Sequence, residues 1–289
     1  MRYILENDNL IAEFDSFGAE LKSVKNKTTG LEYIWNGDPK YWGRTAPVLF
    51  PFVGSLKDGK YTFEDKEYKM TSHGFARDKE HELLRKSDDE IWFTLKDSPE
   101  TYGNYPFHFE FQNGYKLEGN TISVFWRVYN PGQERTDETL YFSVGAHPAF
   151  ACKEKSGCRL YFKGADEIRH HGNLTGTCTH ESLTLKLTDN RAIITPDFFD
   201  RSTYIIEGGQ TNEVGIETPE GHRFITVTFN APLFAIWSPE KKNAPFICIE
   251  PWYGRADYDD YSGDLTLREY GNRLAAKETF ENVYTIKFD

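Results

Sequence analysis

Glu250 stands at the end of a strongly apolar run and is well suited to proton transfer. The run Ala-Pro-Phe-Ile-Cys-Ile precedes it, and Pro251-Trp252 follows. A carboxylate in such surroundings must pair with a cation or have its pKa raised, and a raised pKa suits a general base that works near neutral pH. The alternative is a structural Arg–Glu pair, for example with Arg44.

Two histidines lie in segments where small residues or glycine leave room around the imidazole ring. His147 lies within residues 145–150, at the end of the apolar run 140–144, and His73 directly precedes Gly74. Imidazole gains and loses a proton near neutral pH, so either ring could act as an acid or a base. Each ring could instead be hydrogen-bonded to a nearby carbonyl in a structural role.

Arg44, Arg77 and Trp237 could bind a polar ligand beside such a proton-transfer pair. Arg44 is the only charged residue of the stretch 41–56, and Arg77 follows His73 by four residues. A guanidinium donates hydrogen bonds to sugar hydroxyls or carboxylates, whereas a structural arginine pairs with an acid. The indole of Trp237 could stack on the apolar face of a sugar ring, although a core position is the more common role of tryptophan.

The elements that must position these side chains are β-strands, because apolar and polar residues alternate with period two along the chain. The alternation recurs in residues 107–111, 122–128, 183–187 and 225–229. Turn residues separate the runs, and helical periodicity is limited to short segments near 98–102 and 196–201. The sequence therefore predicts an all-β fold, a large antiparallel β-sandwich with a few short helices, in a single domain that spans residues 1–289.

Charge and composition exclude several classes of partner. The 289 residues include 34 Lys and Arg against 45 Asp and Glu, a formal net charge of −11. An acidic chain without a basic block repels phosphate backbones and anionic membrane surfaces, so we expect neither nucleic acid nor membrane as a partner. The first residues lack the apolar segment of a signal peptide, and no apolar stretch approaches the length of a membrane span. We therefore expect a cytoplasmic protein, whose oligomeric state the sequence leaves open.

Cysteine spacing and the common cofactor motifs give no sign of a metal or cofactor. The four cysteines form no Cys-x-x-Cys pair and are expected to be free thiols, with a disulfide between Cys152 and Cys158 as the alternative. The sequence contains no P-loop, no Gly-x-Gly-x-x-Gly, no Gly-x-Ser-x-Gly and no His-Glu-x-x-His motif. We therefore expect a site without a metal and a reaction without a cofactor.

Four of these segments, in the same order, resemble the aldose 1-epimerase (galactose mutarotase-like) superfamily, and in particular its LacX-like branch. The segments are residues 43–54, 73–77, 145–150 and 249–254. The resemblance implies a large antiparallel β-supersandwich with a sugar-binding cleft on one face. It also implies a cofactor-free mutarotase, an isomerase that interconverts the α and β anomers of a sugar.

The resemblance further implies a role for each matching side chain. His147 corresponds to the general acid that protonates the ring oxygen, and Glu250 to the general base that takes the proton from the anomeric hydroxyl. Arg44 and His73 correspond to positions that bind sugar hydroxyls. Arg77 corresponds to the arginine that contacts phosphate in related hexose-6-phosphate mutarotases, so it is a candidate phosphate contact.

The chain also departs from the family pattern. Galactose mutarotases carry Asn before the catalytic histidine and Tyr-Phe-Asn after it, whereas here Ala146 precedes His147 and Pro-Ala-Phe follows. The family's substrate-binding aspartate has no clear match, and Asp197 and Asp200 are the nearest candidates. Five aromatic residues are expected around the site, as in a cleft that grips the apolar face of a sugar ring: Phe50, Phe75, Phe150, Trp237 and Trp252.

Three functions fit these observations. The favoured hypothesis is an isomerase that opens and recloses the ring of a hexose or hexose phosphate by general acid/base catalysis. The alternative is a non-catalytic carbohydrate-binding or sensing protein, in which sugar binding would survive substitution of His147 and Glu250. A carbohydrate lyase is the third, because similar sandwiches also host that chemistry; it would need a tyrosine or lysine beside the histidine.

Overall fold

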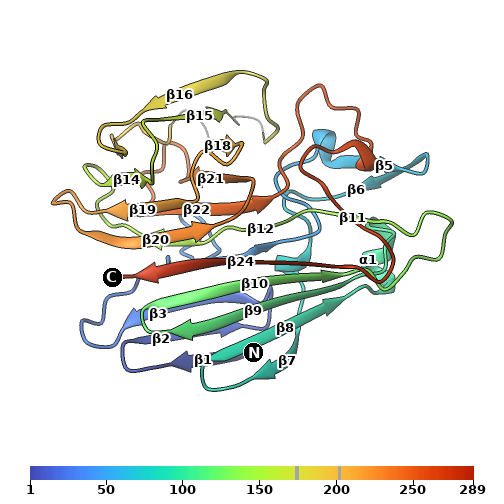
Figure 1. The fold of residues 1–289 in the computed structure, drawn as a ribbon, viewed down its shortest axis with the longest axis horizontal. Helices are drawn as coiled ribbons and strands as arrows, with labels where there is room; N and C mark the ends of the chain where they lie inside the picture. The colour runs from blue at the N-terminus through green and yellow to red at the C-terminus, as the bar shows by residue number, and fades with distance from the viewer. Residues whose placement is uncertain (173–175, 201–202) are drawn as a thin grey trace.

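Antiparallel β-strands dominate the computed structural model, which describes residues 1–172, 176–200 and 203–289 (Figure 1). The strands form a nine-stranded sheet, an eight-stranded sheet, a three-stranded sheet and two two-stranded ribbons. This arrangement confirms the all-β sandwich with a few short helices that the period-two alternation predicted.

The nine-stranded sheet has at its centre β24, the last of the described strands. In spatial order it consists of β17 (Arg191–Ile193), β14 (Arg159–Phe162), β19 (Glu213–Glu217), β20 (Arg223–Phe229), β24 (Thr279–Phe288), β10 (Thr121–Tyr129), β9 (Glu110–Glu118), β8 (Glu90–Lys96) and β7 (Glu82–Lys86). In Figure 1, β24 is coloured red and lies between β20 and β10, with which it pairs along its length. It therefore joins two blocks of strands that are distant in the sequence.

The eight-stranded sheet carries the candidate catalytic residues on and beside β22. In spatial order it consists of β16 (Ser182–Lys186), β15 (Glu167–His171), β18 (Tyr204–Glu207), β21 (Leu233–Trp237), β22 (Phe246–Tyr253), β12 (Val144–Ala146) and β4 (Val48–Leu49), with β13 (Ala149–Ala151) also paired to β22. β22 thus pairs with three strands at once. Because these pairings fix its register, the side chains of β22 have defined positions.

Smaller elements complete the fold. They are the three-stranded sheet β1 (Arg2–Glu6), β2 (Leu10–Asp15) and β3 (Glu20–Asn26), the ribbons β5 (Lys60–Phe63) with β6 (Lys66–Lys69) and β11 (Leu140–Phe142) with β23 (Asn272–Leu274), the helix α1 (Pro99–Asn104), and the 3₁₀ turns η1 (Lys57–Gly59), η2 (Ala76–Asp78) and η3 (Leu265–Leu267). Within the three described ranges, no helix is both long and apolar enough to cross a membrane.

One of the two short helices expected from the sequence is present. α1 begins after Ser98, whose hydroxyl accepts a hydrogen bond from the backbone N–H of Thr101, as a helix N-cap does. Residues 196–199 form a turn instead, and residue 201 of that prediction lies outside the described residues. The turn is closed by bonds between residues three apart, from Phe198 to Thr195 and from Asp200 to Asp197, which do not continue into a helix.

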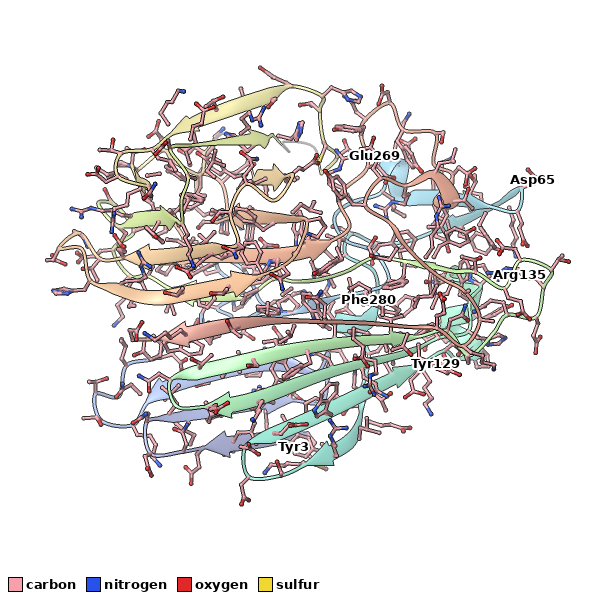
Figure 2. The ribbon with its side chains drawn as sticks, in the orientation of Figure 1. Tyr3, Asp65, Tyr129, Arg135, Glu269 and Phe280 are labelled. Carbon is pink, nitrogen blue, oxygen red and sulfur yellow. The ribbon has the colours of Figure 1, made fainter. Side chains whose placement is uncertain are left out.

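Aromatic rings connect the nine-stranded sheet to the other two sheets. Phe111 of β9 stacks on Phe50, which follows β4, with ring centroids 4.6 Å apart. Tyr115 of β9 packs on Phe14 of β2 at 4.7 Å. Phe280 of β24, labelled in Figure 2, lies 5.1 Å from the ring of Tyr253 at the end of β22. One hydrophobic cluster consequently runs from Leu5 to Phe288, which supports the proposal that residues 1–289 form one domain.

His81 anchors the turn η2, which carries the candidate site residue Arg77. The His81 side chain is buried, and its Nε2 lies 2.9 Å from the carbonyl oxygen of Ala76. Burial lowers the pKa of His81 from 6.5 to about 4, although the hydrogen bond to Ala76 partly opposes this effect. The ring is therefore neutral at neutral pH, and its Nε2–H donates to the carbonyl.

We expect the free energy of unfolding to fall as the pH is lowered from about 6.5 to about 4. The folded-state pKa of His81 lies below the unfolded value, so its contribution to stability is present above pH 6.5 and is lost as the pH falls through this window, by roughly 3 kcal/mol in total. His81→Gln keeps a side-chain N–H donor but cannot titrate. Urea unfolding from pH 4.5 to 7.5 should show a shallower pH dependence for the variant than for the wild type, and identical slopes would contradict the assignment.

Candidate active site

A cleft of about 330 Å³ lies over one face of β21 and β22, where the segments around residues 42, 73 and 147 meet. Its lining includes Trp42, His73, Arg77, His147, Trp237 and Glu250. Of three larger hollows, those of about 550 and 740 Å³ contain no histidine among their described lining residues, and that of about 490 Å³ is lined by His108 but by neither His147 nor Glu250. The chain therefore gathers its candidate acid and base in this cleft.

β22 places Glu250 on the cleft side of the sheet. Ile247 and Ile249 point into the main hydrophobic core, whereas Phe246 and Cys248 pack with tryptophans beside the cleft. Because side chains alternate along a strand, Glu250 shares the face of Cys248. The residue of β21 directly opposite Glu250 is the small Ala235, and the Glu250 side chain is only 1% exposed.

His147 follows β12 and is brought against Glu250 by the pairing of β12 with β22. Its backbone N–H donates to the carbonyl of Pro47 at 3.1 Å, and its Nε2 lies 3.4 Å from Oε2 of Glu250. β12 packs closely on β22 at Gly145, where an added Cβ would lie only 2.7 Å from the indole of Trp252. This close contact fixes the position of β12 relative to β22. The two strongest acid/base candidates of the sequence thus form a buried pair.

Aromatic rings surround the imidazole of His147. The indole of Trp42 stacks on it with centroids 4.7 Å apart and an interplanar angle of 28°, and the ring of Trp237 meets it edge-on at 5.2 Å. The ring of His73 approaches its edge at 5.5 Å. Trp42 was not predicted as a site residue, although it immediately precedes the candidate segment that begins with Gly43-Arg44. Its position next to that segment was the one available signal.

The ring of His73 presents a hydrogen-bond donor toward the cleft. Its Nδ1 accepts a hydrogen bond from the backbone N–H of Gly54 at 3.1 Å, so the proton of the neutral ring is on Nε2. Burial, His147 and then the guanidinium groups of Arg77 and Arg44 lower the pKa of His73 well below 6.5. His73 is therefore neutral and can donate to a ligand hydroxyl.

The backbone around His73 is unusual. His73 itself has φ +67°, and Gly74 follows with φ +71°. A Cβ at position 74 would lie 2.3 Å from the carbonyl oxygen of Phe50. Glycine is therefore required there, which explains the His-Gly sequence in structural terms.

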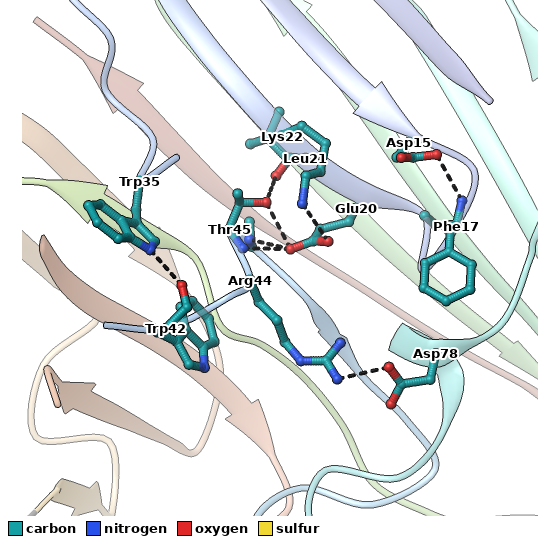
Figure 3. A network of polar contacts seen from close by, with 12 residues as sticks. Asp15, Phe17, Glu20, Leu21, Lys22, Trp35, Trp42, Arg44, Thr45 and Asp78 are labelled. Carbon is teal, nitrogen blue, oxygen red and sulfur yellow. Dashed lines mark hydrogen bonds and ion pairs between the residues drawn. The ribbon is translucent and has the colours of Figure 1, made fainter. Parts of the chain in front are cut away.

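Arg77 lines the cleft, whereas Arg44 is not among the described lining residues and pairs with an acid. Nη2 of Arg77 donates to the carbonyl of Ser72 at 2.6 Å, and its side chain is 14% exposed. Nη2 of Arg44 donates to Oδ1 of Asp78 at 2.8 Å (Figure 3), so its partner is Asp78 rather than Glu250. Burial and the charge of Arg44 lower the pKa of Arg77 to about 10.

Glu20 on β3 holds the loop that carries Trp42 and Arg44. Its Oε1 accepts hydrogen bonds from the backbone N–H groups of Thr45 at 2.7 Å and Ala46 at 2.9 Å (Figure 3). The side chain is buried and its other oxygen pairs with Lys22. The three-stranded sheet thereby positions one wall of the cleft, a role that no motif in the sequence indicated.

Several residues expected at the site lie elsewhere. Asp197 is exposed in the turn 196–199 and accepts a hydrogen bond from the hydroxyl of Thr195, and Asp200 accepts one from the backbone of Lys241. Neither aspartate is among the described residues that line the cleft.

Three of the aromatic residues expected around the site lie in or against the core instead. Phe50 and Phe150 are completely buried in the main core, and Phe75 packs against it. The aromatic lining is formed instead by Trp42, Trp237 and Trp252.

Burial sets the protonation of the His147–Glu250 pair. It raises the pKa of Glu250 well above 4.5, which the nearby indole N–H of Trp252 only partly offsets. It lowers the pKa of His147 to about 3, with Arg77 adding to the effect. Both shifts favour a neutral pair with the dissociable proton on the carboxyl, and transfer of that proton to the imidazole gives a carboxylate and an imidazolium without changing the net charge.

Comparison with known proteins identifies the family of the whole chain. A sequence model described as aldose 1-epimerase matches residues 1–264. The chain belongs to the aldose 1-epimerase family. This result confirms the resemblance found in the sequence, and it supports an isomerase of the mutarotase type.

Several known proteins are similar to this chain over nearly its full length. The chromosomal protein LacX of Lactococcus lactis subsp. lactis is 30% identical over 287 residues, which cover 94% of this chain and 91% of LacX. The structure of a galactose mutarotase related enzyme from Lactobacillus acidophilus is 33% identical with a TM-score of 0.93, covering 100% of this chain and 97% of that one. A galactose mutarotase-like protein from Lactobacillus casei is 28% identical with a TM-score of 0.91, and each chain is fully covered.

One departure from the galactose mutarotase pattern has a structural role in this family member. Ala146, which precedes His147, is buried in the main core, and its carbonyl accepts the indole N–H of Trp252 at 3.2 Å. The segment therefore ties the histidine to β22 through its backbone. This contact uses the backbone carbonyl of residue 146 and not its side chain.

Proposed function

We propose that the chain is a mutarotase that interconverts the α and β anomers of a hexose or hexose phosphate. The observation that supports this most directly is the buried pair at the cleft, in which Nε2 of His147 lies 3.4 Å from Oε2 of Glu250. Ring opening of a sugar needs one proton removed and one proton donated. A pair that shares one proton can perform both transfers.

The proposed reaction begins with transfer of the shared proton to His147. The Glu250 carboxylate then takes the proton from the anomeric hydroxyl while the His147 imidazolium donates its proton to the ring oxygen. The C1–O5 bond breaks and the hydroxyl oxygen becomes the carbonyl oxygen of an open-chain aldehyde. Rotation about C1–C2 and reversal of both proton transfers close the ring on the other face and leave a carboxylate and an imidazolium. Return of the proton from His147 to Glu250 then restores the starting state.

Other cleft residues are proposed to hold the sugar. The Nε2–H of His73 can donate to a hydroxyl, and the indole faces of Trp42 and Trp237 offer apolar contact surface for a pyranose ring. For Arg44 we propose an indirect role in place of the sugar contact that the resemblance implied, because its guanidinium is paired with Asp78 and positions that carboxylate between the two arginines.

Arg77 supplies a positive charge in the cleft that an anionic group on the substrate could contact, in spite of the acidic net charge. Arg44 and Arg77 together contact a single carboxylate, that of Asp78, at 2.8 and 3.8 Å. Nε of Arg77 is buried and has no hydrogen-bond partner among the described residues. Glu240 also lines the cleft and opposes this charge. We therefore propose Arg77 as the contact that distinguishes a phosphorylated sugar from a free one.

Replacing Arg77 with glutamine should affect phosphorylated sugars selectively. A charge-assisted hydrogen bond contributes about 1.5–3 kcal/mol, so kcat/KM for a hexose 6-phosphate should fall by about 10- to 100-fold. The value for the free hexose should change by no more than a few fold. Arg85→Gln is the matched control, since it makes the same chemical change at an exposed arginine outside the cleft lining. Equal losses on both sugars would contradict a phosphate contact at Arg77.

The direct test of the proposed function is the loss of optical rotation from fresh α-anomers. The panel should include α-glucose, α-galactose and their 6-phosphates, with polarimetry or anomer-resolved NMR as the readout. Faster equilibration than in buffer on at least one sugar is expected. If none is accelerated while calorimetry detects sugar binding, the chain is a binding protein rather than a mutarotase.

A further inference from the structure

Cys248 is a buried thiol beside the acid/base pair that the proposed reaction does not use. It precedes Glu250 by two residues on β22, so both side chains lie on the same face of the strand. Its neighbours across the adjoining strands are Ala149 on β13 and Trp237 on β21. The residue is fully buried and its thiol is free.

The thiol, the imidazole and the carboxyl group converge on one point. One potential ligand atom from each of His147, Cys248 and Glu250 lies within 4.8 Å of the other two. Around a tetrahedral zinc ion, bond lengths of about 2.0–2.3 Å place nitrogen and oxygen ligands about 3.3 Å apart, and sulfur about 3.6 Å from nitrogen. The His147–Glu250 separation of 3.4 Å already meets this requirement, and the sulfur would have to move by about 1 Å.

The carboxyl group of Glu250 lacks hydrogen-bond partners among the described residues. Neither carboxylate oxygen of Glu250 forms a hydrogen bond with the described residues, and its side chain is 99% buried. The ammonium group of Lys155 donates instead to the hydroxyl of Ser238 at 2.7 Å. Among the described residues, Glu250 therefore has no lysine or arginine as an ion-pair partner.

We propose that His147, Cys248 and Glu250 form an inhibitory binding site for a thiophilic divalent cation of the zinc type. The cation would take one nitrogen, one sulfur and one oxygen ligand and leave its fourth position to water or a sugar hydroxyl in the cleft. The pair gives up its shared proton and Cys248 its thiol proton, so two protons leave as one divalent cation enters. The net charge of the site is then unchanged.

Inhibition follows because the cation occupies both groups that transfer protons. This consequence rests on the proposed function, whereas binding of the cation does not. A soft sulfur ligand together with imidazole selects zinc and cadmium over magnesium and calcium, which prefer oxygen ligands. Magnesium at the same concentration should therefore leave the protein unaffected.

A second pair of thiols must be removed before binding is measured. The Sγ atoms of Cys152 and Cys158 lie 3.5 Å apart and could themselves hold a thiophilic cation. Cys152→Ala/Cys158→Ala is therefore the background for the binding test. This double variant leaves Cys248 and the cleft intact.

Cadmium provides the binding test, because a cadmium–thiolate bond has an ultraviolet charge-transfer band. Titration of the chelator-treated background protein should show one equivalent of band-forming cadmium. Adding Cys248→Ala should abolish the band, and Cys248→Ser is the substitute if the alanine variant is unstable. A band that persists without Cys248, or no band in the background protein, would overturn the proposal.

Zinc provides the activity test on the same proteins. Zinc should inhibit anomer exchange and a chelator should restore it, and Cys248→Ala should raise the half-inhibiting zinc concentration at least tenfold. Equal sensitivity of both proteins, or cadmium binding at Cys248 without zinc inhibition, would overturn the inhibitory assignment. If the protein has no mutarotase activity, the cadmium titration still decides whether the cation site exists.

Discussion

Glu250→Gln is expected to lower kcat/KM for anomer exchange by about 100- to 10,000-fold, the range that a positioned general base contributes. Glutamine occupies nearly the same volume but cannot accept the anomeric proton or share one with His147. Because the carboxyl of Glu250 is buried with a raised pKa, its removal does not leave an unpaired charge in the core. The loss should therefore appear in the rate rather than in stability.

Polarimetry with the best sugar of the panel measures this effect, and thermal unfolding tests whether the variant remains folded. Glu240→Gln is the matched control, since it makes the same chemical change at another carboxylate of the same cleft. We expect the control to retain activity within about tenfold of the wild type, as for a residue without a proton-transfer role. A Glu250→Gln protein that is folded and as active as the control would exclude Glu250 as the base.

His147→Asn is the second change with a large expected effect, again about 100- to 10,000-fold. Asparagine retains a polar side chain in the space between Trp42 and Trp237 but cannot protonate the ring oxygen. Sugar binding should weaken much less than turnover, so calorimetry should still detect the ligand. His180→Asn, at an exposed position, is the control for loss of a histidine.

Combining the two substitutions separates a cooperating pair from two independent residues. If His147 and Glu250 act on one shared proton, the double variant should be about as slow as the slower single variant, because removal of either partner already disables the pair. Multiplication of the two single losses would argue that each group acts alone.

The sequence alone predicted the strand-rich fold because alternation is a local property. Residues 122–128 and 225–229 lie within β10 and β20, and the apolar run before Glu250 lies within β22. Alternation could not distinguish a regular strand from an extended segment, and residues 107–109 precede β9 without belonging to it. The order of strands within the sheets depends on pairings between distant residues, which no local pattern encodes.

The candidate site was predicted in part for a similar reason. The structure brings His147, Glu250, His73, Arg77 and Trp237 to one cleft, as expected from polar residues within apolar or glycine-containing segments. Trp42 was missed because a tryptophan in an aromatic-rich chain does not stand out. Asp197 was assigned by analogy rather than from its surroundings, and the turn that holds it exposes its side chain.

The position of β24 also affects how the molecule can form. This strand pairs with β10 and β20, both of which are synthesised well before it. Until β24 emerges from the ribosome, each of these strands has an unpaired edge, which is the kind of edge that allows intermolecular pairing and aggregation. Closure of the nine-stranded sheet is thus a late event with high contact order, and such events are slow. During synthesis, the chain should therefore depend on protection of these two edges.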